Sequence, residues 1–234
     1  MSKPLRLFSV LLYCFVAALP AFANPFINGG FESPSFGPNT NSYPVTIPGW
    51  HTNDSSFEIW GSGFLGVSAF EGVQFAELNA FIAGTLYQDI NGIGAGSRVG
   101  FQFAHRGRDQ VDTMRFTLTD LGADGVLGGE DDTILYSGVY SDGTQAWGYY
   151  DASGVSAIYA LGNTVRFSYT AVEFSSGSVG NFLDAADFGV GVGGVPASAP
   201  DAGSTLSLVG ISLGLMAWAS RRASIEVDAS QFSE

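Results

Sequence analysis

Basic residues are scarce in this chain of 234 residues, and so is cysteine. Nine Lys and Arg stand against 22 Asp and Glu, which gives a formal net charge of −13. Nucleic-acid binding depends on cationic side chains that displace counterions from phosphates, so this balance excludes a nucleic-acid partner. The same charge suits a chain that stays soluble outside the cell or meets divalent cations.

Charged residues as a whole are also few, at 13% of the chain, whereas Phe and Gly are abundant at 19 and 32. This composition argues against disorder and against a long helical bundle. Abundant Gly together with aromatic residues predicts short strands and tight turns. The length predicts one folded domain with appendages.

The N-terminus has the three parts of a secretory signal peptide, which we assign to residues 1–23. A basic start precedes an apolar run over residues 7–19, and small residues occupy positions 21 and 23. This order predicts export with cleavage after Ala23, and the run is short for a retained membrane anchor. Cleavage would remove Cys14, the single Cys, so the mature chain would have neither a disulfide framework nor thiol chemistry.

The C-terminus contains a second targeting segment. A linker with a short motif (195–205) leads into an apolar segment (206–222) that ends in Trp218 and an Arg pair, and an acidic tail (223–234) follows. Trp at the interface and Arg on the cytoplasmic side are typical of a membrane helix. The apolar stretch is short for a spanning helix, and a buried core helix is the alternative.

This end resembles the PEP-CTERM class of bacterial sorting signals, in the variant written Val-Pro-Asp-Ser-Gly. The residues that carry the resemblance are Pro200, Asp201, Gly203, Arg221 and Arg222. It implies recognition by a membrane protease of the exosortase type, transient anchoring in the inner membrane, and delivery to the cell surface or extracellular matrix of a Gram-negative, often biofilm-forming, bacterium. Ala202 in place of the usual Ser, and the acidic tail, depart from the pattern.

Residues 24–194 remain for folding, which is ample for one core. Several segments alternate apolar and polar residues with period two, as half-buried strands do. The clearest are 99–104, 114–119 and 165–170, and the shorter ones are 57–60, 74–78, 85–90, 133–140 and 147–150. Gly, Asn and Asp separate nearly all of them, as turns require. The pattern predicts an all-β domain, a jelly-roll β-sandwich.

Specific segments resemble galactose-binding-like jelly rolls, a group that includes several carbohydrate-binding module families. The opening is carried by residues 28–34 and 47–50. Further segments resemble one branch of that group, the secreted bacterial choice-of-anchor domains, which are similar to a plant cell-wall family; they are 57–64, 74–79, 86–89, 103–108 and 181–184. The resemblance implies association with a glycan or the cell wall, and for this branch the ligand is generally unassigned.

The same resemblance implies a structural Ca²⁺ site where the first and last strands meet. The ligands carried over are Glu32 and Asp184 together with backbone carbonyls, and Asp187 is a further candidate because the usual acidic pair is split here. Ca²⁺ prefers six to eight oxygen ligands, which such a corner supplies. The alternative is that these carboxylates only cap turns.

A second acidic loop, residues 120–132, contains Asp120, Asp124 and Asp131. Carboxylates this close repel one another unless a cation neutralises them, which suggests a second Ca²⁺ site. The loop lacks the alternating acids of an EF-hand. A solvated hairpin loop is the alternative, which the sequence slightly favours.

Glycan contact would use aromatic faces for sugar rings and polar groups for hydroxyls. The candidates are Trp147, Tyr149, Trp60 and Asn79, with Arg106 and Arg108 for an anionic glycan. The alternative for the two arginines, which the sequence favours, is pairing with Asp109 or Asp112 at a strand-to-loop corner.

Catalysis has little support in the sequence. His51 and His105 show no metal-ligand spacing, and carboxylate pairs such as Glu58 and Glu77 occur in any acidic chain. We therefore expect no enzyme, but an exported, surface-anchored, Ca²⁺-stabilised module that binds exopolysaccharide or cell-envelope glycan. The alternative is a structural matrix or biofilm protein without a specific glycan site, and a glycoside-active enzyme ranks third.

Overall fold

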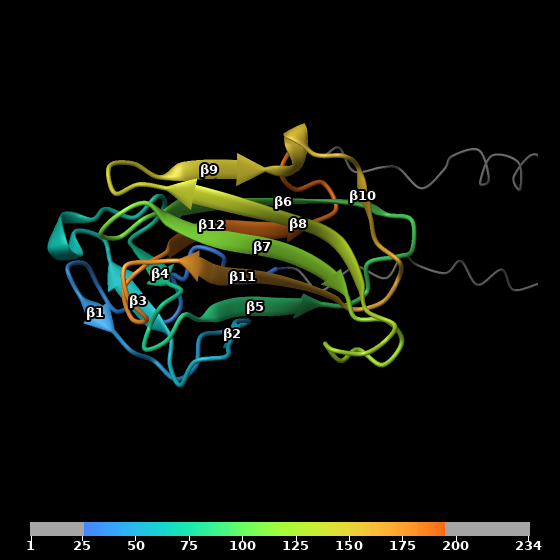
Figure 1. Ribbon diagram of the computed structural model, residues 1–234, viewed down its shortest axis with the longest axis horizontal. Helices are drawn as coiled ribbons and strands as arrows, with labels where there is room; N and C mark the ends of the chain where they lie inside the picture. Colours follow the sequence, from blue (N-terminus) through green and yellow to red (C-terminus); the bar gives the residue numbers. More distant parts are fainter. Residues whose placement is uncertain (1–25, 195–234) are drawn as a thin grey trace, which may run out of the picture.

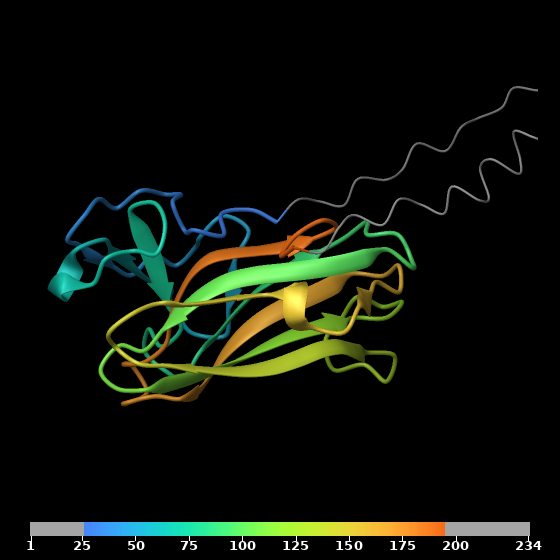
Figure 2. The same cartoon turned by 90° about the horizontal axis from the view of Figure 1, so that it is seen from above.

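Two antiparallel sheets packed face to face form the part of the chain that the computed structural model describes, residues 26–194 (Figure 1 and Figure 2). The predicted signal peptide (1–23), sorting linker (195–205), membrane segment (206–222) and tail (223–234) lie outside the described residues. Within 26–194, no helix has the length and apolar character needed to cross a membrane.

The larger sheet has the strand order β1-β3-β4-β12-β6-β10, with β9 also paired to β6, and the smaller sheet has the order β2-β5-β11-β7-β8. In chain order the strands are β1 (Asn41–Ser42), β2 (His51–Thr52), β3 (Glu58–Gly61), β4 (Gln74–Glu77), β5 (Thr85–Ile90), β6 (Arg98–Arg106), β7 (Asp112–Asp120), β8 (Thr133–Asp142), β9 (Gly148–Asp151), β10 (Ile158–Tyr159), β11 (Val165–Glu173) and β12 (Phe182–Gly189). Two short 3₁₀ turns, η1 (Phe64–Gly66) and η2 (Ala152–Gly154), interrupt the loops.

The predicted all-β jelly-roll sandwich is confirmed. The three segments with the clearest alternation are β6, β7 and β11, and each strand extends beyond its predicted bounds. The two-residue strands β1, β2 and β10 were not predicted, because two residues are too few to display a period.

Aromatic rings from both sheets fill the space between them. Phe101 and Phe103 of β6 meet Phe116 of β7, with ring centroids 4.6 and 5.2 Å apart, and Phe116 lies 5.0 Å from Tyr169 of β11. All four side chains are fully buried. Aromatic pairs of this kind add stability beyond the area that they bury, so these rings hold the two layers together.

A second, smaller apolar cluster covers the outer face of the larger sheet where β3, β4 and β12 meet. Trp60, Phe75 and Phe182 lie within 4.8 to 6.0 Å of one another, and residues of the loop between β3 and β4 pack against them. The larger sheet is therefore buried on both faces at this end.

The buried hydroxyl of Tyr169 generates a test of this packing, because it has no hydrogen-bond partner among the described residues. An unpaired buried polar group destabilises the fold, so Tyr169→Phe should leave the free energy of unfolding unchanged or raise it by up to about 1 kcal/mol. Phe103→Ala, the matched control in the same core, should lower it by about 3–5 kcal/mol. Urea unfolding measures both, and a clear loss in Tyr169→Phe would mean that the hydroxyl has a partner.

Candidate functional site

The outer face of the five-stranded sheet carries a regular grid of polar side chains. β11 pairs in register with β5 on one side and with β7 on the other. Residues opposite one another in antiparallel strands share a face, so the pairing sets their side chains in rows. The three rows, read from β5 through β11 to β7, are Thr85, Thr170 and Arg115; Tyr87, Ser168 and Thr117; and Asp89, Arg166 and Thr119.

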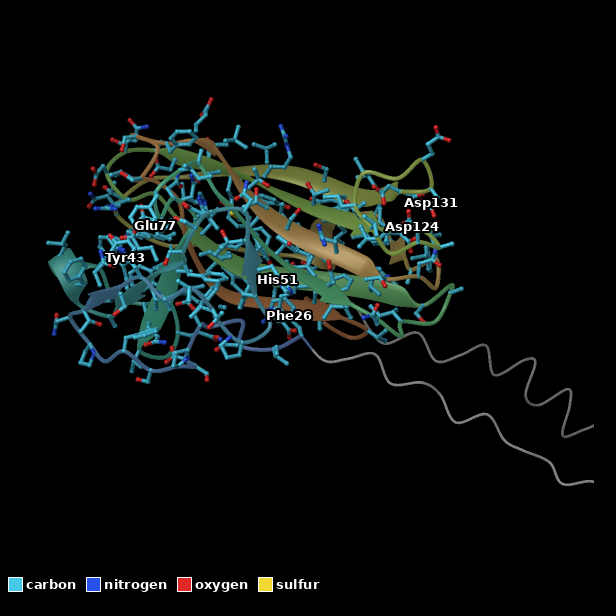
Figure 3. The ribbon with its side chains drawn as sticks, turned by 90° about the horizontal axis from the view of Figure 1, so that it is seen from below. Phe26, Tyr43, His51, Glu77, Asp124 and Asp131 are labelled. Atoms are coloured by element: carbon cyan, nitrogen blue, oxygen red, sulfur yellow. The ribbon has the colours of Figure 1, made fainter. Side chains whose placement is uncertain are left out.

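This face is hollowed over the grid. The hollow has a volume of about 490 Å³ and is lined by all the grid residues except Asp89, together with Asn53 and Leu127. A second hollow of about 410 Å³ lies over the loop around β2. His51, labelled in Figure 3, lines the second hollow and stacks on Tyr87, which lines the first. Both volumes lie in the range of small-ligand sites.

A rigid stack of planar groups stands at one side of the hollow. The Arg166 guanidinium carbon lies 4.0 Å from the centroid of the Tyr87 ring, and His51 stacks on the same ring at 5.2 Å. Arg166 binds Asp89 through two hydrogen bonds of 2.7 and 2.8 Å, which raise the pKa of the guanidinium. The bidentate pair fixes the plane of Arg166 and with it the shape of this wall.

The remaining grid side chains keep hydrogen-bonding capacity. The Thr85 and Thr170 hydroxyls bond to each other at 3.0 Å, whereas those of Thr117 and Ser168 have no partner among the described residues. Each free hydroxyl offers one donor and two acceptor positions. The hollow can therefore bond a ligand that itself carries many hydroxyls.

Most of the predicted glycan-binding aromatic and amide residues have structural roles. Trp60 and Asn79 are 1% and 0% exposed, so the prediction that they contact a glycan is wrong. Trp147 donates its indole N–H to the Ser68 carbonyl at 2.9 Å and packs on the second apolar cluster. Tyr149 is 47% exposed and stacks on Phe70 at 5.7 Å, on the larger sheet and away from the hollow.

The two predicted cationic residues bind within the protein. Arg106 donates to the Thr144 carbonyl, and Arg108 binds the Glu77 carboxylate at 2.8 Å. Arg108 also lies over the Trp60 ring, with 4.7 Å between the guanidinium carbon and the ring centroid. Asp109, a partner expected from the sequence, is only at the 4.0 Å limit of an ion pair. The sequence predicted that an arginine fixes a corner through a nearby acid. The main side-chain partner of Arg108 is instead Glu77, 31 residues away in the sequence.

The first predicted Ca²⁺ residues hold a loop in place. Asp184 accepts amide N–H groups from Phe70 and Glu71 at 2.9 and 3.1 Å, and Glu32 accepts from the amides of residues 73 and 74 at 2.8 and 3.1 Å. Burial raises the pKa of Asp184 to about 7, and the nearby Glu71 charge adds a smaller increase. The hydrogen bonds from the backbone amides oppose this shift. Both acids thus cap the loop that leads into β4.

Asp187 lies beyond a bulge in β12 that separates it from Asp184, and it accepts the amide of Phe188 at 2.8 Å. Among residues 26–194, no group of three or more His, Cys, Asp or Glu side chains is arranged to hold a metal ion. Ca²⁺ binding at this corner therefore stays a prediction.

The acidic loop uses its carboxylates in the same way. Asp120 is buried and accepts hydrogen bonds from Gly122 and Asn163, at 3.1 and 2.9 Å. Asp124 and Asp131 each accept an amide N–H from within the loop, at 2.9 and 2.7 Å. Figure 3 shows these two residues at the end of the sandwich opposite Glu77. A second Ca²⁺ site here likewise stays a prediction.

A buried acid pair occupies the other end. Glu58 and Glu77 lie directly opposite each other in β3 and β4, and each is 1% exposed. Glu58 accepts hydrogen bonds from Asn41, Tyr43 and the Trp60 indole at 2.8 to 3.1 Å. Burial raises the pKa of Glu77 to about 9, and the charge of Glu58 is the second cause of the increase. Arg108 acts in the opposite direction and lowers this pKa. Neither carboxylate can reach a substrate from this position.

No protein-family model and no curated protein matches the chain. One similar solved structure is TmCBM61 in complex with β-1,4-galactotriose, with 14% identity and a TM-score of 0.46 over 71% of this chain and 98% of that chain. A second is the C-terminal family 22 carbohydrate-binding module of Clostridium thermocellum Xyn10B, with 12% identity and a TM-score of 0.45 over 73% and 98% of the two chains. A third is the CBM22-1 xylan-binding domain of Paenibacillus barcinonensis Xyn10C, with 10% identity and a TM-score of 0.43 over 72% and 92% of the two chains. At these identities and TM-scores, the similarities carry no conclusion about what this chain binds.

The raised pKa of Glu77 generates a prediction about pH. An acid whose pKa is higher in the folded than in the unfolded state stabilises fully below the unfolded value, 4.5, and this stability is lost as the pH rises towards 9. Asp184 acts in the same sense only up to about pH 7. Between pH 7 and 9 the free energy of unfolding should therefore fall, by up to about 1.4 kcal/mol per pH unit for one proton.

Glu77→Gln should flatten this fall, because the amide does not titrate. Urea unfolding at pH 7, 8 and 9 measures it, with Glu130→Gln in the exposed part of the acidic loop as the control that keeps the wild-type slope. If the free energy of unfolding of Glu77→Gln fell with pH as steeply as that of the wild type, Glu77 would not be the group that titrates in this range.

Proposed function

We propose that this protein is a non-catalytic module that binds exopolysaccharide or cell-envelope glycan through the hollow of the five-stranded sheet. The observation that carries the proposal is the grid of hydroxyl, guanidinium and aromatic groups set in register over β5, β11 and β7. A polysaccharide presents many hydroxyls along a flat ring, and this surface offers matching donors and acceptors beside planar side chains.

The lining of the hollow supports binding rather than hydrolysis. Glycoside hydrolysis uses two carboxylates roughly 5–10 Å apart across the scissile bond. The residues that line the hollow include no Asp or Glu, and Asp89, in the same row of the grid as Arg166, is bound to that arginine. The Glu58 and Glu77 pair is buried elsewhere. A sugar in this hollow would be held and not cleaved.

Export and anchoring complete the proposal, and both rest on the sequence. The segment 1–23 would direct secretion, and the motif at 200–203 with the apolar segment would engage an exosortase-type protease at the inner membrane. The folded domain would then be displayed at the cell surface or in the extracellular matrix of a Gram-negative bacterium.

Ca²⁺ stabilisation is also proposed, at the corner of Glu32 and Asp184, with Asp187 as a further candidate ligand. A β-carbon on Gly30 would lie 3.7 Å from a Glu32 carbon and 3.7 Å from an Asp184 oxygen, so the two side chains approach the same glycine. Backbone carbonyls and water would have to supply most of the oxygen shell of Ca²⁺. The charge of the ion would offset the repulsion between Asp184 and the neighbouring Glu71.

The hollow itself is tested by removing its free hydroxyls. We expect the double variant Thr117→Val, Ser168→Ala to bind its best array glycan about tenfold or more weakly, because each lost hydrogen bond is worth roughly 1 kcal/mol. Isothermal titration measures the affinities, and Tyr149→Ala on the larger sheet is the control that should bind normally. Loss in Tyr149→Ala alone would move the site to that face, and no binding to any glycan would favour the matrix role.

The Ca²⁺ proposal is tested by thermal melts. Millimolar Ca²⁺ should raise the melting temperature of the chelator-treated protein by several degrees, because ligands that bind only the folded state stabilise it. Asp184→Asn should lose this response, whereas Asp124→Asn in the other acidic loop should keep it. Identical wild-type melts with Ca²⁺ and with chelator would rule out the corner site.

A further inference from the structure

Positive charge is rare in the folded part of the chain, and one arginine is left without a partner. Residues 26–194 contain five Arg and no Lys, beside 18 Asp and Glu. Arg106, Arg108 and Arg166 bind the Thr144 carbonyl, Glu77 and Asp89, and Arg98 also has an interaction. Arg115, in contrast, is exposed and has no hydrogen bond or ion pair within the described residues.

The free guanidinium stands on the wall of the hollow. Arg115 lies in β7 opposite Thr170 of β11 and lines the same hollow as Thr117 and Ser168, one row further along the sheet. Successive rows on one face are about 7 Å apart, within reach of an extended arginine side chain. A ligand bonded to the free hydroxyls therefore lies within reach of the guanidinium.

The charges around the hollow are unevenly placed. Glu173 lies in the row next to that of Arg115. It accepts a hydrogen bond from the Thr113 hydroxyl at 2.8 Å and makes no ion pair with Arg115. At the opposite end, Asp89 and the acidic loop, through Asp132, offset the charge of Arg166. Of the two guanidinium groups that line the hollow, Arg166 is thus paired with a carboxylate, and Arg115 has no carboxylate partner within the described residues.

An unpaired, exposed arginine in so acidic a domain is available to an anion from outside the domain. The 18 acids provide many chances for an internal pair, and the other arginines have found partners. Guanidinium recognises a carboxylate through two parallel hydrogen bonds, which gives geometry as well as charge. A carboxylate on the ligand itself could form both of these hydrogen bonds with Arg115.

We propose that the glycan bound in the hollow is an acidic one, and that Arg115 holds the carboxylate of a uronic acid unit. The inference rests on the proposed function, since it concerns the same hollow. Thr117 and Ser168 would bond ring hydroxyls of the same sugar or its neighbour, and the carboxylate would lie at the Arg115 end. This site replaces Arg106 and Arg108, whose guanidinium groups bind inside the protein.

The test compares ligands that differ only in the carboxylate. Oligomers of galacturonate, mannuronate and glucuronate, and their methyl esters, are titrated into the purified protein, and isothermal titration measures their affinities. At least one free acid should bind ten times or more tightly than its ester. Its affinity should fall as NaCl rises from 50 to 300 mM, because the contact is ionic and partly exposed.

Variants then assign the contact to Arg115. Arg115→Gln should weaken binding of the free acid about tenfold and leave binding of the ester unchanged. Arg115→Lys should bind the free acid with intermediate affinity, because it keeps the charge but not the bidentate geometry. Arg98→Gln in the larger sheet changes the net charge equally and should bind like the wild type.

Four outcomes would overturn the inference. Equal binding of acids and esters would leave a neutral-glycan site, whereas normal acid binding by Arg115→Gln would place the carboxylate contact on another residue, and both results would spare the proposed function. Tighter binding of sulfated dextran than of every uronate would show recognition of charge alone. Binding of neither acids, esters nor any array glycan would reject the proposed function as well.

Discussion

The fold and the candidate site both depend on one constraint, the in-register pairing of β11 with β5 and β7. Because a strand alternates faces, aligning Phe167 and Tyr169 with the core also aligns Ser168 and Thr170 with the outer surface. A slip of one residue would bury the polar set and expose the aromatic set. The hydrophobic core therefore fixes the position of the polar grid, with no separate device to organise it.

The two sheets consequently present different outer faces. On the larger sheet, loops cover the β3–β4 end and bury Glu58 and Glu77 with Arg108. This arrangement costs desolvation and leaves one Glu58 oxygen without a hydrogen-bond partner among residues 26–194. On the smaller sheet, the corresponding face stays open and hydroxyl-lined. Carboxylates are used for holding loops, and the open sheet face is left for a ligand.

The sequence predicted the fold better than the site, for a physical reason. Period-two alternation is local, so β6, β7 and β11 could be read directly. Which polar residues meet depends on register between distant strands: Thr117 and Ser168 lie 51 positions apart and become neighbours only in the sheet. The polar residues that alternate with the apolar ones in these segments could have predicted a polar outer sheet face, and they line the hollow. Conversely, Trp60 lies on the outer face of its sheet, and burial by a loop could not be foreseen from its strand.

The central claim is that the hollow over β5, β11 and β7 is the binding surface. An amide-resolved NMR titration of the folded domain with the tightest-binding oligosaccharide tests it most directly. The account predicts shift changes concentrated at Tyr87, Arg115, Thr117 and Ser168, with the amides around Tyr149 unaffected. Changes confined to the larger sheet, or saturable binding without any change in these three strands, would contradict it.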